Sequence, residues 1–448
     1  MLEDRFGGRH TSDDPVALAA FEEAVLGILA HRPGVAPALE QVLAADPAFT
    51  AAHALNGLAA VILARRELLA PAGTALAAAK AALAARGGTA GEHVLVAALA
   101  EAVEGRLASA LPGLDAWLRQ APHDLLVVKL AHAFRFMLGD AAGMRAASAR
   151  VLPAWDASRP GYGFVLGCHA FALEESGELR AAEVAGREAV LHQPDDAWAM
   201  HAVSHVHEME GRAEHGIAWL EGSRPAWSRC NNFAFHLAWH LALFHLERGR
   251  HARVLELYDR EVRPQPTDDF RDVANAVSLL WRLQQEGVAV GERWVELEAI
   301  ARRRRHDTTL VFATLHYLLA LVAAGDLAAA YELTATLRTT ALAGTGDQAG
   351  VAGRVGLDLA NAILALRQHR LPRLTWDRLV KATTELGGSN AQRDVFVRTL
   401  ALLAADGGDD VTTARIMAHR RRLKREDRFA RLVRMRLEAA RIQRGRAA

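Results

Sequence analysis

The sequence predicts an all-α protein built from stacked helical hairpins, an α-solenoid. Its composition is the first observation, because 51% of the 448 residues are hydrophobic, with Ala and Leu prominent and few β-branched runs bounded by turn residues. The second observation is a ladder of glycines at intervals of 34 or 38 residues, a period typical of helical-hairpin repeats. Its members are Gly105, Gly139, Gly177, Gly211, Gly249, Gly287 and Gly325.

Each ladder glycine is predicted to end the first helix of a hairpin, because glycine tolerates the positive φ of a helix C-cap. In tetratricopeptide repeats, small residues follow five and twelve positions later, where the two helices approach closely, and a proline follows at seventeen. The repeat around Gly177 matches all three positions, with Ala182, Ala189 and Pro194. The repeats around Gly139 and Gly211 lack the proline. The pattern therefore indicates degenerate tetratricopeptide-like hairpins.

Three regions are expected within one continuous superhelix. Residues 1–90 form an N-terminal helical capping region, residues 91–340 form the repeat superhelix, and residues 341–448 form C-terminal helical repeats with a basic capping helix. Because each repeat contacts mainly its neighbours, a solenoid can reach 448 residues without dividing into separate globular domains.

The chain carries no sign of secretion or membrane insertion. Its first residues, MLEDRFGGRHTSDDP, have no apolar signal core, and no run of about 18 apolar residues follows. The two cysteines, Cys168 and Cys230, fall within predicted helices and are expected to be free thiols in a reducing compartment. We therefore expect a cytoplasmic protein without a transmembrane segment.

A basic tail stands out against a nearly neutral chain, whose net charge is +1. The segment from Arg415 to Arg446 contains 13 Lys or Arg residues and three acidic residues. The tail therefore carries a net charge of +10, and the remainder of the chain carries −9. Such a tail could bind RNA, an anionic membrane surface or the chain's own acidic residues. We favour an amphipathic capping helix with a solvated basic face, since apolar residues recur along it, and we do not expect nucleic acid as a partner.

Five stretches spread over nearly the whole chain carry a more specific resemblance. They are ADPAFTAAHALNGL (Ala45–Leu58), HAFALEESGEL (His169–Leu179), DAWAMHAVSHVHEMEGR (Asp196–Arg212), FHLAWHLALFHLERG (Phe235–Gly249) and GGSNAQRDVF (Gly387–Phe396). In this order they resemble segments of the tetratricopeptide repeat protein 38 family, and the paired histidine helices are the most specific part. The resemblance implies an α-solenoid with degenerate repeats and leaves the biochemical activity open.

A cluster of histidine and carboxylate side chains is predicted on one stretch of the concave groove. His201, His205 and Glu208 are spaced i, i+4 and i+7, so they share one face of a helix. Counted from Gly211, these positions line the groove in a tetratricopeptide repeat. The same count places further side chains from neighbouring hairpins beside them: Lys129, Glu174, His236 and Trp239. We therefore predict a site for a peptide segment of a protein partner or for a small polar molecule.

The same histidines offer an alternative, a divalent metal site. HxxxH occurs at His201 and His205 and again at His236 and His240, and four imidazoles would complete a tetrahedral ligand set. Glu208 or Glu174 could join it. The chain has no HExxH or CxxC motif, and His240 is expected to turn toward neighbouring helices. Three alternatives remain. The first is an enzyme that uses the cluster as metal ligands or as general acid and base. The others are a purely structural adaptor that uses surface patches and a buried network of hydrogen-bonded histidines without a ligand.

Other motifs add little chemistry. The chain contains neither a GxxxxGK[ST] phosphate loop nor a GxSxG elbow. In GGSNAQRD, Ser389 or Asn390 is expected to cap a helix, with Arg393 or Asp394 forming an ion pair to a neighbouring repeat. The oligomeric state does not follow from the sequence.

Overall fold

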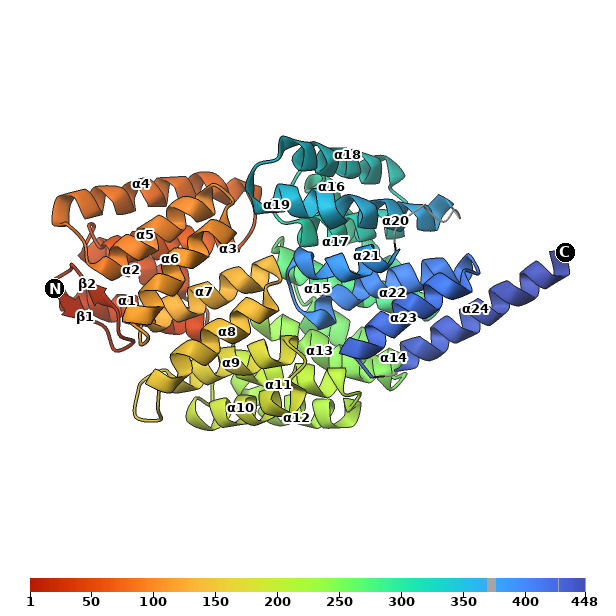
Figure 1. The fold of residues 1–448 in the computed structure, drawn as a ribbon, viewed down its shortest axis with the longest axis horizontal. Coiled ribbons are helices and arrows are strands. Elements are labelled where there is room, and N and C mark those ends of the chain that lie inside the picture. The colour runs from red at the N-terminus through yellow and green to blue at the C-terminus, as the bar shows by residue number, and fades with distance from the viewer. Residues whose placement is uncertain (369–375, 426, 448) are drawn as a thin grey trace. The chain divides into compact units, whose positions relative to one another are not determined.

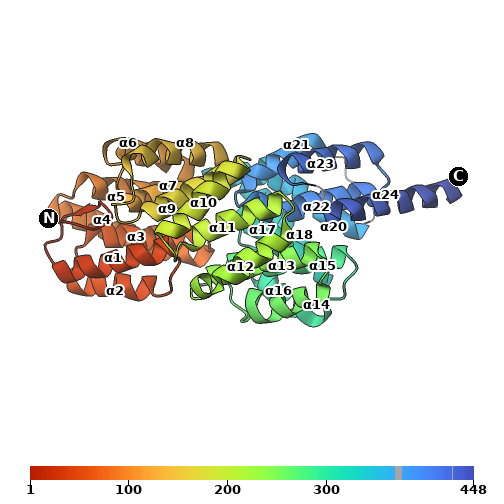
Figure 2. The ribbon, with the colours of Figure 1, turned by 90° about the horizontal axis from the view of Figure 1, so that it is seen from below.

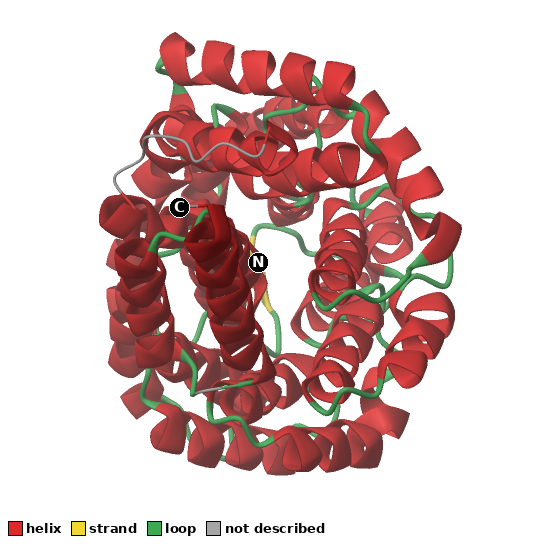
Figure 3. Cartoon of the chain, turned by 90° about the vertical axis from the view of Figure 1, so that its right-hand side faces the viewer, coloured by secondary structure: helices red, strands yellow, loops and turns green. Residues whose placement is uncertain are grey.

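The computed structural model describes residues 1–368, 376–425 and 427–447. Over these residues the protein is all-α, as predicted (Figures 1 and 3). The strands within the described residues form one short antiparallel pair near the N-terminus, β1 (Leu2–Glu3) and β2 (Arg9–His10).

The chain forms two compact units that are not consecutive in sequence. Unit 1 comprises Met1–Val206 and Ser223–Ala234, and unit 2 comprises His207–Gly222 and Phe235–Ala448. The chain passes from the first to the second within helix α11 (Ala197–Met209). The boundaries expected near residues 90 and 340 lie inside unit 1 and unit 2, respectively.

Unit 1 is a series of helical hairpins. Neighbours in sequence pack together, as α9 does against α10, and α3 and α7 also contact the first helix of the next hairpin, α5 and α9 (Figures 1 and 2). The helices before α11 are α1 (Pro15–Leu29), α2 (Val35–Ala45), α3 (Thr50–Ile62), α4 (Leu69–Arg86), α5 (Ala90–Val103), α6 (Leu107–Gln120), α7 (Leu125–Leu138), α8 (Ala141–Val151), α9 (Tyr162–Glu175) and α10 (Leu179–His192).

The turn between the two N-terminal strands, together with His10, packs into unit 1. The Asp4 carboxylate accepts hydrogen bonds from the backbone N–H groups of Phe6 and Gly8, at 2.8 and 2.9 Å, and lies 2.8 Å from His10 Nε2. The His10 ring in turn packs on Phe21 and Phe49. The Asp4 carboxylate is therefore satisfied beside an apolar cluster.

Unit 2 contains most of α12 (Ala213–Trp227), followed by α13 (Phe233–Glu247) from its third residue onward. Its other α-helices are α14 (His251–Leu257), α15 (Phe270–Gln285), α16 (Trp294–Arg303), α17 (Val311–Ala324), α18 (Leu327–Ala343), α19 (Gly346–Val351), α20 (Leu357–Gln368), α21 (Trp376–Ala382), α22 (Asn390–Asp406), α23 (Asp410–Leu423) and α24 (Arg428–Ala447). Helix α22 packs on α15, where Trp281 Nε1 donates to Thr399 Oγ1 over 118 residues of sequence.

The glycine ladder marks helix ends, as predicted. All seven glycines have φ between +67° and +88°. Gly139 is the C-cap of α7 and Gly325 that of α17. The predicted cap of GGSNAQRD is confirmed as well, since Ser389 and Gln392 form a capping box at the start of α22.

The basic tail is not wholly solvated, because six of its cations pair with acidic residues of unit 2, and three of these cations reach buried carboxylates. Arg420 pairs with Asp394 and Asp427, Lys424 Nζ lies 2.9 Å from Glu208, and Arg428 Nε lies 2.7 Å from Glu286. The apolar face of α24 packs inward, burying Phe429 and Val433. Of the partners considered for the tail, the chain's own acidic residues take these three cations.

Two helical stretches of the described residues, Arg66–Arg86 and Gly346–Arg367, are long and apolar enough to cross a membrane. Length and composition alone are weak evidence, because core helices of soluble proteins pass the same test. In the second stretch 61% of the most apolar window is buried inside the protein.

Candidate functional site: two histidine pairs

The first histidine pair lies on the part of α11 that belongs to unit 1. Asp196 caps this helix, because its carboxylate accepts hydrogen bonds from the backbone N–H groups of Trp198 and Ala199 at 3.0 and 3.1 Å. His201 and His205 follow one helical turn apart and share a face. Both side chains are buried, with exposed fractions of 1% and 0%.

A carboxylate orients this pair. His205 Nδ1 lies 3.0 Å from Glu174 Oε2 on α9, and His205 Nε2 lies 2.9 Å from His201 Nε2. When the carboxylate accepts a hydrogen bond from Nδ1–H of His205, the neutral form of the ring carries its lone pair on Nε2. The two Nε2 atoms therefore converge on one point, where a proton or a cation would be shared.

A second carboxylate lies beside the same ring. Glu175 Oε1 is 3.8 Å from His205 Nδ1, and ligand atoms of Glu174, Glu175 and His205 all lie within 4.8 Å of one another. Carboxylate oxygens and imidazole nitrogens at this separation are donors that a divalent cation can use.

Aromatic rings enclose the first pair. Phe171 stacks on His201 at a centroid distance of 5.4 Å, and Trp198 lies 5.0 Å from the same ring. The Lys129 ammonium lies over Trp198, 4.8 Å from the ring centroid. Trp198 therefore contacts both the Lys129 ammonium and the His201 ring.

Burial shifts the pKa values of neighbouring groups in unit 1. It raises the pKa of the Asp196 carboxyl to about 7, although Lys129 opposes the shift. It also raises the pKa of the Cys168 thiol to about 11, so this cysteine is not a thiolate nucleophile at neutral pH.

The second histidine pair lies on α13 in unit 2 and has the same design. His240 Nδ1 is 3.1 Å from Glu208 Oε2, and His236 Nδ1 is 2.9 Å from Asn275 Oδ1 on α15. Trp239 stacks on His236 and donates its Nε1–H to Ser278 Oγ at 3.0 Å. In this pair as well, an oxygen atom lies at hydrogen-bond distance from Nδ1 of each ring. Nε2 is the other nitrogen of the ring.

The predicted ligand residues are buried, whereas the repeat register places them on a groove open to a ligand. None exceeds 8% exposure: Lys129, Glu174, His201, His205, Glu208, His236 and Trp239. His240 is also fully buried. For Glu208 the physical reason is the C-terminal segment, whose Lys424 covers it. The structure joins Glu174 with His205 and His201, and it joins Glu208 with His240.

Three residues that sequence reasoning missed complete these contacts. Glu175 follows the predicted Glu174 directly, and this adjacent pair of glutamates in the sequence could have indicated it. Asn275 and Lys424 lie 39 and 216 residues from their partners, so no local spacing points to them.

The fold and the two pairs define an all-α protein with buried histidine and carboxylate clusters. No family model matches the chain.

Proposed function

We propose that this protein binds a divalent transition metal ion, with Zn²⁺ as the best chemical match, through the imidazoles of its two HxxxH pairs. One observation carries the proposal: in three of the four rings, Nδ1 meets an oxygen acceptor, supplied by Glu174, Asn275 and Glu208. Metal-binding histidines are held in this way by outer hydrogen bonds, which orient the ring and raise its basicity.

The spacing of the first pair fits this use. Zinc–nitrogen bonds of about 2.0–2.1 Å in a tetrahedral set separate two nitrogens by about 3.3 Å. His201 Nε2 and His205 Nε2 are 2.9 Å apart and share one proton. Zn²⁺ would displace this proton to solvent, and a small rotation of either ring would admit the ion. Each pair supplies two of the four ligands that tetrahedral zinc takes. A metal with an open position would instead activate water, which is the enzymatic alternative.

A small polar ligand is the second candidate. Lys129, 8% exposed and placed over Trp198, brings a positive charge next to the first pair and favours an anionic group. An extended peptide is less well supported, because a peptide needs accessible side chains and those of the predicted site are buried.

We also propose that the helical hairpins form a tetratricopeptide-like solenoid related to the tetratricopeptide repeat protein 38 family, in the cytoplasm. The glycines of positive φ at the repeat interval and the buried Ala182 and Ala189 support this placement. Cys168 and Cys230 are free thiols, which suits a reducing compartment.

Metal titration tests the main proposal. Protein stripped of metal is titrated with Zn²⁺, and bound metal is measured by elemental analysis for the native chain and for His205→Ala, His240→Ala and His245→Ala. His245 is a matched control, since it is buried on α13 but belongs to neither pair. We expect His205→Ala and His240→Ala to lose metal and His245→Ala to keep it. A native chain that binds no Zn²⁺ would refute the proposal.

A further inference from the structure

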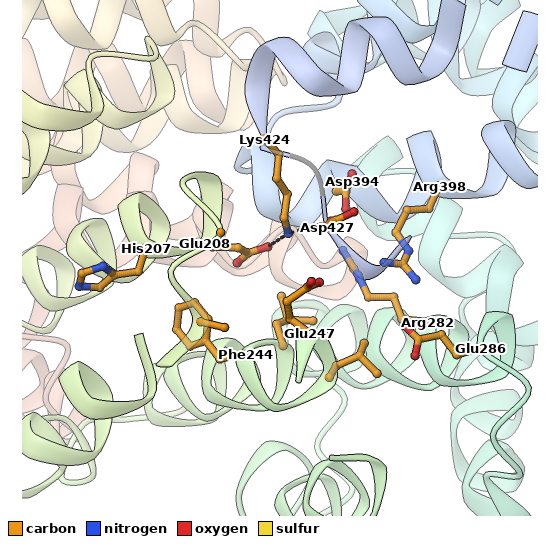
Figure 4. Close-up of a pocket in the computed structure, with 14 residues that line it drawn as sticks. His207, Glu208, Phe244, Glu247, Arg282, Glu286, Asp394, Arg398, Lys424 and Asp427 are labelled. Carbon is orange, nitrogen blue, oxygen red and sulfur yellow. Dashed lines mark hydrogen bonds and ion pairs between the residues drawn. The ribbon is translucent and has the colours of Figure 1, made fainter. Parts of the chain in front are cut away.

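A small cavity in unit 2 lies where the end of α11, α13, α15, α22 and the connection between α23 and α24 meet (Figure 4). Its volume of about 30 Å³ accommodates water molecules, and its walls are mostly charged. Glu208 and Lys424 both line it, and Lys424 points from the C-terminal segment directly at the Glu208 carboxylate.

Glu208 is shared by two cationic or proton-donating partners. Its Oε1 lies 2.9 Å from Lys424 Nζ, and its Oε2 lies 3.1 Å from His240 Nδ1. Only 5% of Glu208 is exposed. Burial lowers the pKa of Lys424, but the carboxylates of Glu208 and Asp427 outweigh this effect and hold it above the ordinary value, so the side chain is an ammonium.

The C-terminal segment holds Lys424 in place through contacts that do not involve the histidines. The N–H of Arg425 donates to the Met209 carbonyl at 2.9 Å, and the N–H of Arg428 donates to Glu247 at 2.7 Å. Arg420 contacts both Asp394 and Asp427 in pairs of hydrogen bonds between 2.6 and 3.0 Å. The ammonium is therefore presented to Glu208 by a prearranged network.

We propose that Lys424 regulates metal binding at the second pair by competing with the metal-loaded His240 for Glu208. This inference rests on the proposed metal function. A dication bound to His240 would lie close to the Lys424 ammonium, because both groups contact Glu208. The two positive charges repel in a buried environment of low dielectric constant. Metal binding therefore loosens the docked C-terminal segment, and docking of the segment weakens metal binding, as linkage requires.

Two substitutions at opposite ends of one ion pair test the competition. Lys424→Met removes the competing charge and is expected to tighten Zn²⁺ binding, by about tenfold. Glu208→Gln removes the carboxylate that orients His240 and is expected to weaken binding, by about 10–100-fold. A purely structural pair would weaken binding in both variants, so the opposite signs identify competition.

The controls use the same segment. Lys424→Arg retains the charge and should keep the native affinity. Arg421→Met removes an exposed charge from helix α23, which ends at Leu423 just before Lys424, and should change nothing. Melting curves confirm that each variant is folded, and the visible spectrum of the Co²⁺-substituted protein reports the ligand set. Native protein that binds zinc, together with a Lys424→Met variant of equal or weaker affinity, would overturn this inference alone. Native protein that binds no zinc would overturn the metal function and this inference together.

Discussion

Single hydrogen bonds decide what the buried histidines can do. A neutral imidazole has one donor and one acceptor nitrogen, and the partner on one side determines which is which. Glu174 sets His205, Glu208 sets His240 and Asn275 sets His236, each through Nδ1. The chemistry of the site therefore depends on single side chains, and the carboxylates matter as much as the imidazole rings that they orient.

Glu174→Gln tests this assignment at the first pair. Glutamine keeps the size of the side chain but removes the charge that makes the His205 ring basic, so zinc affinity should fall by about 10–100-fold. Melting curves of the variant and of the native chain show whether the fold is retained. Competition with a chromophoric chelator gives the affinity, and an unchanged value would contradict the assignment.

His132 should make stability depend on pH. Burial, aided by Lys129 and Arg135, lowers its pKa to about 3. Below about pH 6.5 the unfolded chain therefore binds a proton that the native chain does not, and stability is lost as the pH falls toward 3. Asp196, with its pKa raised to about 7, has the opposite dependence over part of this range.

The difference between two proteins isolates the His132 contribution. Between pH 6 and pH 5, the unfolding free energy of the native chain should fall by about 1 kcal/mol more than that of His132→Leu. Urea unfolding at several pH values gives these free energies. Parallel pH profiles for the two proteins would show that His132 is protonated in the folded state.

At the scale of the element, small residues let the hairpin helices approach one another. Ala182 and Ala189 on α10 are fully buried, and each lies in an apolar cluster with residues of α9 and α11. Gly186 belongs to the same face, since a Cβ built there would meet Val203 at 2.7 Å. The packing thus explains the small-residue spacing that the repeat pattern predicts.

Enlarging these contacts should destabilise the hairpin. Ala182→Leu is expected to lower the free energy of unfolding by about 1–3 kcal/mol, because the added carbons have no space between the helices. Val184→Leu, on the exposed side of α10, is the matched control and should have little effect. Equal melting of the two variants would show that the interface accommodates the larger side chain.

At the scale of the whole molecule, charge is divided between a tail of +10 and a remainder of −9. Part of this separation is neutralised within unit 2, where Arg420, Lys424 and Arg428 bind carboxylates. Breaking a buried pair by removing one partner leaves an uncompensated charge, at a cost of about 3–5 kcal/mol. The tail is therefore a stabilising part of this unit.

Removing residues 424–448 should lower the melting temperature and promote aggregation. The truncation deprives Glu208 and Glu286 of cations and exposes the apolar surface that Phe429 and Val433 cover. Thermal unfolding and light scattering provide the measurements. A truncated chain that stays soluble with unchanged melting, but loses salt-sensitive binding to a labelled RNA, would make the tail a nucleic-acid arm instead.

Features that depend on neighbours along the chain followed from the sequence by itself. Glycine at positive φ, the Ser389 cap and two histidines one turn apart are consequences of local backbone geometry, which residue type and spacing encode. Only the tertiary structure decided burial and partners. Asn275 lies 39 residues from His236 and Lys424 lies 216 residues from Glu208, and such contacts arise when helices pack, which no local period specifies. The histidines were therefore predictable as pairs, whereas the oxygen atoms that orient them and the ammonium that competes for Glu208 were not.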